Sequence, residues 1–171
     1  MQYLLLSAVF VVALTLTFAP PDRAAGDDVA TVRQRLYEDL ASPSPGAQHV
    51  RQLMQSQQDD GSWPDIDYAD RTKGGWAPHA HLTRMKDLAE AYRHADNPLA
   101  GNEDLRRALH AALNYWLEHD PTGKNWWNNE IGTPRGVAET MVLLGEELTG
   151  EQLQRGRKIL QRAKIGMTGQ N

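Results

Sequence analysis

The 171-residue sequence contains no cysteine. The fold therefore has no disulfide, and neither a thiol nucleophile nor a thiolate metal site is possible. Positive charge is not in excess either, because 18 Lys and Arg are set against 22 Asp and Glu, and the net charge is −4. This mild acidity argues against a nucleic-acid partner. It also means that a site for an anionic ligand has to be positive locally.

Long apolar runs are lacking beyond the N-terminus. The run from Tyr3 to Ala19 is too short for a comfortable membrane span, and proline and small residues follow it. Residues 1–25 are therefore expected to be a signal peptide of a secreted protein, extracellular or periplasmic, with no stable membrane partner. The segment departs from the usual pattern because no Lys or Arg precedes the run and Pro20 follows the small-residue site. A signal anchor is the alternative.

Common catalytic and cofactor motifs are also lacking. The chain has no Gly-x-Ser-x-Gly and no His-Glu-x-x-His, and Thr122-Gly123-Lys124 lacks the other residues of a phosphate loop. His79 and His81 have no third ligand at a recognisable interval, so a capping or hydrogen-bonded packing role is preferred for them. We therefore expect no metal and no cofactor.

Strand-like alternation is lacking over any useful length, whereas helical spacing of apolar residues recurs along residues 26–171. Residues 59–78, rich in Asp and Gly, read as an ordered loop. Asn102 is expected to cap one helix, Thr133 to cap the next with Pro134 in its first position, and Thr149 with Gln152 to form a capping box. The apolar stripes begin with Val29, Val32, Leu36 and Leu40; Val50, Leu53 and Met54; Leu82, Met85 and Leu88; Leu105, Leu109 and Leu113; Val137, Met141 and Leu144; and Leu153, Ile159 and Leu160. The pattern predicts an all-α array of antiparallel helix hairpins.

The most informative segment of the chain is Asn125-Trp126-Trp127-Asn128-Asn129-Glu130-Ile131-Gly132-Thr133-Pro134-Arg135. Adjacent residues diverge by about 100° on a helix and point to opposite faces of a strand, so both tryptophans are hard to bury in one stripe. We expect at least one indole to be exposed. A flat apolar ring among amides suits the C–H face and hydroxyls of a sugar, whereas a loop that tucks both rings under itself is the structural alternative.

This segment resembles the signature of polysaccharide lyase family 8, secreted enzymes that cleave hyaluronan, chondroitin or xanthan. Three further segments match in the same order: Asp60-Gly61-Ser62-Trp63-Pro64-Asp65-Ile66-Asp67-Tyr68, His79-x-His81-x-x-Arg84, and Met167-Thr168-Gly169-Gln170-Asn171. The resemblance covers roughly residues 30–171. It implies that residues 26–171 are the N-terminal part of an (α/α)-toroid domain, an incomplete toroid consisting of its opening helix hairpins.

The resemblance also implies site roles. Asn171 would be catalytic, donating an amide N–H to the uronate carboxylate while the proton at C5 is removed, although it cannot take that proton itself. Asn125, Trp126 and Trp127 would bind the acidic polysaccharide substrate, and Arg135 either joins them or pairs with Glu139 one turn later. The family's tyrosine base and histidine acid lie farther along, with the missing C-terminal half of the domain, so the 171-residue chain alone is expected to be inactive.

Two other functions fit parts of the sequence. Gln57-x-x-x-Gly61-x-Trp63 matches a motif of triterpene cyclases, which are also α/α barrels, but it occurs once and Asp65-Ile66-Asp67-Tyr68 lacks the last residue of their Asp-x-Asp-Asp acid. A glycan-binding module without catalysis is the third reading, because the binding elements are present and the proton-transfer groups are not. A lyase product with a new double bond would absorb ultraviolet light, whereas a binding module would yield none.

Overall fold

The computed structural model describes residues 22–41 and 44–164. Six α-helices make up most of this part of the chain, and none of its residues forms a strand. A short π-helix, Asn128–Gly132, leads directly into α5, and a 3-10 turn, Gly145–Glu147, follows α5. The α-helices are α1 Asp22–Leu40, α2 Ala47–Ser56, α3 His79–Arg93, α4 Glu103–His119, α5 Thr133–Leu144 and α6 Gly150–Leu160. The predicted all-α class is confirmed.

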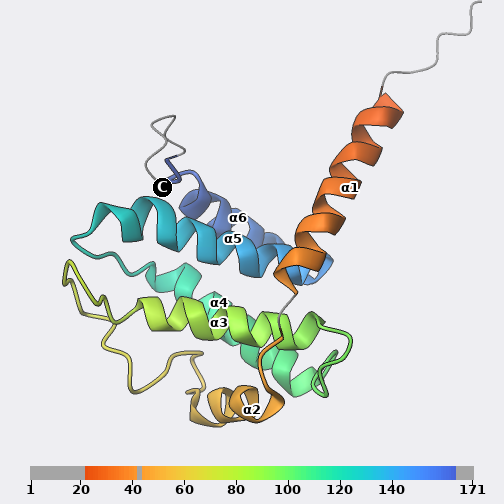
Figure 1. Cartoon of the computed structure of the whole chain (residues 1–171). Coiled ribbons are helices and arrows are strands. Elements are labelled where there is room, and N and C mark those ends of the chain that lie inside the picture. Colours follow the sequence, from red (N-terminus) through yellow and green to blue (C-terminus); the bar gives the residue numbers. More distant parts are fainter. Residues whose placement is uncertain (1–21, 42–43, 165–171) are drawn as a thin grey trace, which may run out of the picture.

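Two antiparallel hairpins form the body of the molecule (Figure 1). Helices α3 and α4 make the first hairpin, α5 and α6 make the second, and α3 packs on α5 while α4 packs on α6. Helix α2 lies against α3. The C-terminal end of α1 contacts α5, and the rest of α1 projects away from the body. This is the helix-hairpin array that the apolar spacing predicts.

The helix ends test the capping predictions one by one. The Asn102 side chain accepts from the Leu105 N–H at 2.9 Å, and Thr149 with Gln152 forms both bonds of a capping box, so these two predictions are confirmed. The prediction for Thr133 is wrong. Thr133 is the first residue of α5 and not its cap, because the π-helix before it already has helical backbone, and Pro134 is the second residue of α5. The Thr133 hydroxyl is buried without a hydrogen-bond partner.

The segment between α2 and α3 is the ordered loop predicted for residues 59–78. Trp63 lies fully buried and donates its indole N–H to the Leu53 carbonyl at 3.0 Å. The Gln57 amide reaches the carbonyls of Gly61 and Ala108, at 3.2 and 3.0 Å, and ties the loop to α4. Gly61 has φ of +90°, and a Cβ there would lie 2.1 Å from the Ala111 oxygen, so only glycine fits. The three residues that match the cyclase motif thus have structural roles.

The hydrophobic core lies between the two hairpins and under this loop, and Trp63, Met85, Leu88, Leu105, Leu109, Leu113, Trp116, Val137, Leu143 and Leu144 are among its fully buried members. Leu144 of α5 and Ile159 of α6 are also buried in this core. An exposed apolar stripe lies on α1, at Val29, Val32 and Leu36. No helix in the described ranges is long and apolar enough to cross a membrane.

Candidate functional site

The tryptophan pair begins the short helical segment that precedes α5. Trp126 is 59% exposed and Trp127 is 40% exposed, so the chain presents two indoles to solvent where at least one was expected. They are the exposed tryptophans of the described chain, since Trp63, Trp76 and Trp116 are buried. Two large apolar rings held at the surface lie outside the core and are accessible to a ligand.

Two asparagines fix the backbone that carries the indoles. The Asn125 carboxamide oxygen accepts from the Trp127 N–H at 3.0 Å, and its NH₂ group donates to the Lys73 carbonyl at 3.2 Å. Asn129 forms a two-bond clamp on Gly123, accepting from its N–H at 3.0 Å and donating to its carbonyl at 2.9 Å. Asn125 therefore anchors the Trp126–Trp127 pair, hereafter the platform, and it keeps one N–H that could bond a ligand. No local sequence pattern predicts the two hydrogen bonds between Asn129 and Gly123.

The absence of a side chain at Gly132 leaves room for the Trp127 ring. A Cβ built on Gly132 would lie 2.7 Å from Cζ3 of that ring, closer than real side chains approach. The ring thus rests on the bare backbone of the π-helix. Short π-helices within α-helices often occur at functional sites.

Arg135 forms an ion pair within its own helix. Its Nε donates to Glu139 at 2.7 Å, which confirms the predicted intrahelical pair, and its side chain is 71% exposed. The substrate-binding role of Arg135 stays a prediction. Asn171 lies outside the described residues, as does the segment 1–21 with most of the expected signal peptide.

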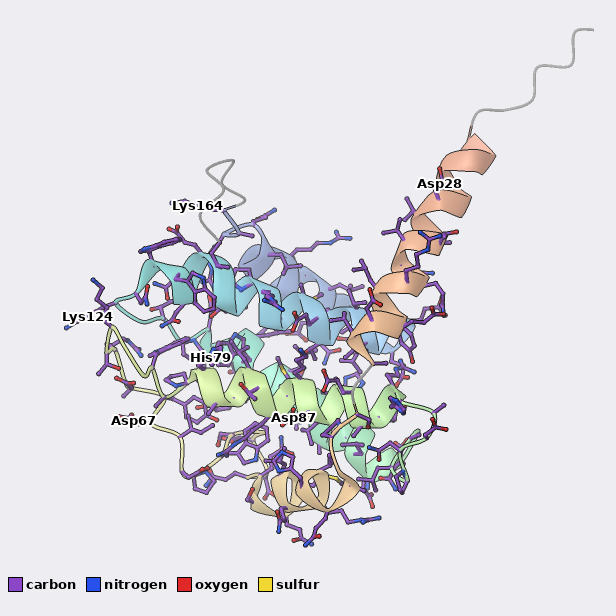
Figure 2. The ribbon with its side chains drawn as sticks, viewed as in Figure 1. Asp28, Asp67, His79, Asp87, Lys124 and Lys164 are labelled. Atoms are coloured by element: carbon purple, nitrogen blue, oxygen red, sulfur yellow. The ribbon has the colours of Figure 1, made fainter. Side chains whose placement is uncertain are left out.

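Several charged side chains lie near the end of the molecule that carries the tryptophan segment. Figure 2 shows Lys124 at this end, with Asp67 and His79 on the neighbouring loop and helix start, and Lys164 on the side of α6. Lys164 pairs with Glu130 at 3.0 Å, and Arg162 forms a bidentate pair with Asp120 at 2.5 and 2.8 Å. Arg71, Lys73 and Lys124 are exposed and form no ion pair with other described residues.

Tyr68, on the loop before α3, and His81, on α3, form a hydrogen-bonded pair. The Tyr68 hydroxyl is 2.9 Å from Nδ1 of His81, and Nε2 of His81 is 3.0 Å from the Ala112 carbonyl. A carbonyl only accepts, so Nε2 carries the proton, Nδ1 accepts from Tyr68, and the Tyr68 oxygen accepts the Trp63 N–H. Burial raises the pKa of Tyr68 to about 12 and lowers the pKa of His81 to about 4.

These shifts are opposite to what acid–base catalysis near neutral pH requires. A tyrosine with a raised pKa resists becoming a base, and a fully buried histidine with a lowered pKa resists becoming an acid. His81 therefore has the hydrogen-bonded packing role that the sequence indicated. Within residues 22–41 and 44–164 no group of three or more His, Asp or Glu could hold a metal ion.

A family model for the N-terminal α-helical domain of polysaccharide lyase family 8 matches residues 22–166. The chain belongs to this family. Chondroitinase-AC of Pedobacter heparinus is 31% identical over 138 residues, which are 79% of this chain and 19% of that protein. Hyaluronate lyase of Staphylococcus aureus is 26% identical over 100 residues, 43% of this chain and 12% of that protein.

The solved structures agree with the sequence comparison. A chondroitinase AC lyase, determined in a study of enzyme–oligosaccharide complexes, superposes with a TM-score of 0.68 at 26% identity. The match covers 78% of this chain and 20% of that structure. This family 8 chain thus spans no more than about a fifth of the length of these relatives. Its helices correspond to the N-terminal helical domain of the family.

Proposed function

We propose that this chain is the N-terminal, substrate-binding part of a secreted lyase that cleaves an acidic glycosaminoglycan of the chondroitin or hyaluronan type by β-elimination. The observation that carries the proposal is the exposed pair Trp126 and Trp127, held on a fixed backbone in a chain of family 8. The names of the two relatives support the substrate class, because chondroitin and hyaluronan are both acidic glycosaminoglycans.

The energetics of the platform suit a glycan. Two indoles that are about half covered by a sugar chain contribute at most about 5 kcal/mol before the ordering of the sugar is subtracted. Pyranose C–H faces lie flat on such rings, and the glycan's hydroxyls face amides such as the remaining N–H of Asn125. Indole faces together with amide groups support a modest affinity for each sugar ring and allow successive sugars of a repeating glycan to bind in the same way.

The chemistry of the described residues supports binding without turnover by this chain alone. Removal of the proton at C5 of a uronate needs a base of accessible pKa. Tyr68 and His81 are hydrogen-bonded to each other, and burial shifts the pKa of each away from the range that a catalytic base or acid needs. By resemblance, Asn171 stabilises charge on the carboxylate during elimination, and the proton-transfer groups come from the rest of the lyase. A glycan-binding module without catalysis is the alternative.

The test measures binding and turnover on the same samples. The 171-residue protein and its Trp126→Ala/Trp127→Ala variant are titrated with chondroitin and hyaluronan oligosaccharides by calorimetry, and absorbance of the unsaturated product is followed. The control is Val29→Ala/Leu36→Ala, which removes exposed apolar surface from α1 instead. We expect roughly ten- to hundredfold weaker binding for the tryptophan variant only, with unchanged helicity and no product.

Three outcomes contradict parts of the proposal. Unchanged affinity in the tryptophan variant overturns the platform, and absence of any binding by the parent protein overturns glycan recognition by this chain. Product formed by the 171-residue protein contradicts the role assigned to Tyr68 and His81. Product formed by a longer form of the lyase separates the β-elimination enzyme from the binding module, which would yield none at any length.

A further inference from the structure

We infer that Arg71, Lys73 and Lys124 form a cationic rim that binds the carboxylate or sulfate groups of the acidic glycan where it extends past the Trp126–Trp127 platform. The inference rests on the proposed glycan-binding function and adds a second subsite to it. It starts from a constraint of composition: a chain of net charge −4 has no overall attraction for a polyanion, so attraction has to come from a local cluster.

Backbone hydrogen bonds place the three cations beside the platform. The Lys124 N–H donates to the Arg71 carbonyl at 3.3 Å, and the Asn125 amide donates to the Lys73 carbonyl at 3.2 Å. The loop of residues 70–76 therefore lies against the loop of residues 121–127, and both occupy the same end of the molecule (Figure 1). Lys124 is two residues from Trp126, so the rim and the platform share one segment of backbone.

The charges of the rim are available to a ligand. Lys73 and Lys124 are exposed, and within the described part of the chain neither lies within ion-pair distance of a carboxylate. Arg71 uses Nη1 to hold the carbonyls of Tyr68 and Asp70, at 3.1 and 3.0 Å, and keeps its other N–H groups. Its planar guanidinium suits two-oxygen contacts with carboxylate or sulfate.

Acidic neighbours reduce the local charge without cancelling it. Asp70 accepts from the N–H groups of Ala77 and Thr72, at 2.8 and 2.7 Å, and these bonds hold its pKa below the usual 3.8. Asp67 accepts from the Ala69 N–H at 2.9 Å. Both carboxylates are engaged with their own loop, whereas the two lysine ammonium groups have no such internal acceptor among the described residues.

The experiment compares a rim variant with a charge-matched control. Lys73→Ala/Lys124→Ala removes two exposed cations, and Arg35→Ala/Arg51→Ala removes two exposed cations from α1 and α2. Arg71 is kept in both, because it shapes its loop. Calorimetric titrations use sulfated chondroitin, unsulfated chondroitin and carboxyl-reduced unsulfated chondroitin oligosaccharides of one length, at low and high salt. The first two separate sulfate from carboxylate as the bound group.

We expect about tenfold weaker binding of the charged oligosaccharides by the rim variant at low salt, and a much smaller difference at high salt. The neutral oligosaccharide should bind the parent and both variants equally, through the tryptophans. Equal affinity of the rim and control variants for charged oligosaccharides overturns the rim and leaves the platform intact. If the tryptophan variant also keeps full affinity, or the parent binds nothing, the proposed function fails together with the rim.

Discussion

The stability of this protein should fall as the pH is lowered from 7 to 5, and buried His81 is the main reason we expect it. Its ring is completely buried, in contact with the rings of Trp63, Tyr68 and Tyr115. Burial lowers its pKa from 6.5 to about 4, nearby Arg84 adds to the effect, and the Ala112 carbonyl and Asp60 oppose it. The folded protein therefore keeps His81 neutral at a pH where the unfolded chain protonates it.

The sign and size of the effect follow from this difference. Above pH 6.5 both states are neutral at this position and the full stability is present; between 6.5 and 4 only the unfolded state gains a proton. With these two pKa values the free energy of unfolding falls by about 2 kcal/mol at pH 5 and by about 3 kcal/mol well below pH 4. Half-buried His110, whose pKa is lowered mainly by burial, adds a loss of the same sign.

The assay is urea unfolding followed by circular dichroism at pH 7 and pH 5, for the wild type and for His81→Gln. The variant should be less stable at pH 7, because it loses ring contacts, but its dependence on pH should be weaker by about 2 kcal/mol over this interval. If the variant does not fold, the pKa of the wild-type ring is measured by NMR titration. A pKa above 6, or an equal pH dependence in wild type and variant, would refute the reasoning.

Two further predictions concern the platform and export. Gly132→Ala should displace the Trp127 ring, because the new Cβ would lie 2.7 Å from it, and should weaken glycan binding about threefold or more. The control is Gly150→Ala, whose Cβ meets nothing within 4 Å. Equal glycan affinities of the two variants would refute this prediction. Mass spectrometry of the exported protein should show an N-terminus between Pro20 and Asp27, whereas the full-length chain in the membrane fraction would indicate an anchor.

Much of the fold could be predicted because local signals and packing agree. Asn102 and Thr149 are helix caps in the sequence and in the structure, and the apolar stripes of α3, α4 and α5 are the core. The stripe of α1 shows the limit of such reasoning. Periodicity predicts a helix there and is right, but it cannot tell whether another part of a molecule covers Val29, Val32 and Leu36.

The exposure of the tryptophan pair could be predicted from the sequence, whereas the geometry around the pair could not. Adjacent tryptophans among amides indicated exposure, and both rings are exposed. The contact between Lys73 and Asn125 joins residues 52 positions apart, so no local pattern could reveal it. The expected contact of Asn125 with substrate stays a prediction. In the structure, one N–H and the oxygen of its carboxamide hold the loop, because a polar side chain next to a tight turn readily bonds nearby backbone.

The error at Thr133 and the exposure of Trp126 have one physical origin, the π-helix Asn128–Gly132. Trp126 lies 11 residues before Val137, about three turns of an α-helix, so an uninterrupted α-helix would place its indole within roughly 20° of the buried Val137 stripe. A π-turn accommodates about one more residue and rotates everything before it by roughly 100°. Trp126 thereby leaves the buried stripe, and helical backbone already precedes Thr133, where a cap would have been needed. The same irregularity that defeats the helix-start prediction thus keeps the Trp126 indole exposed to solvent.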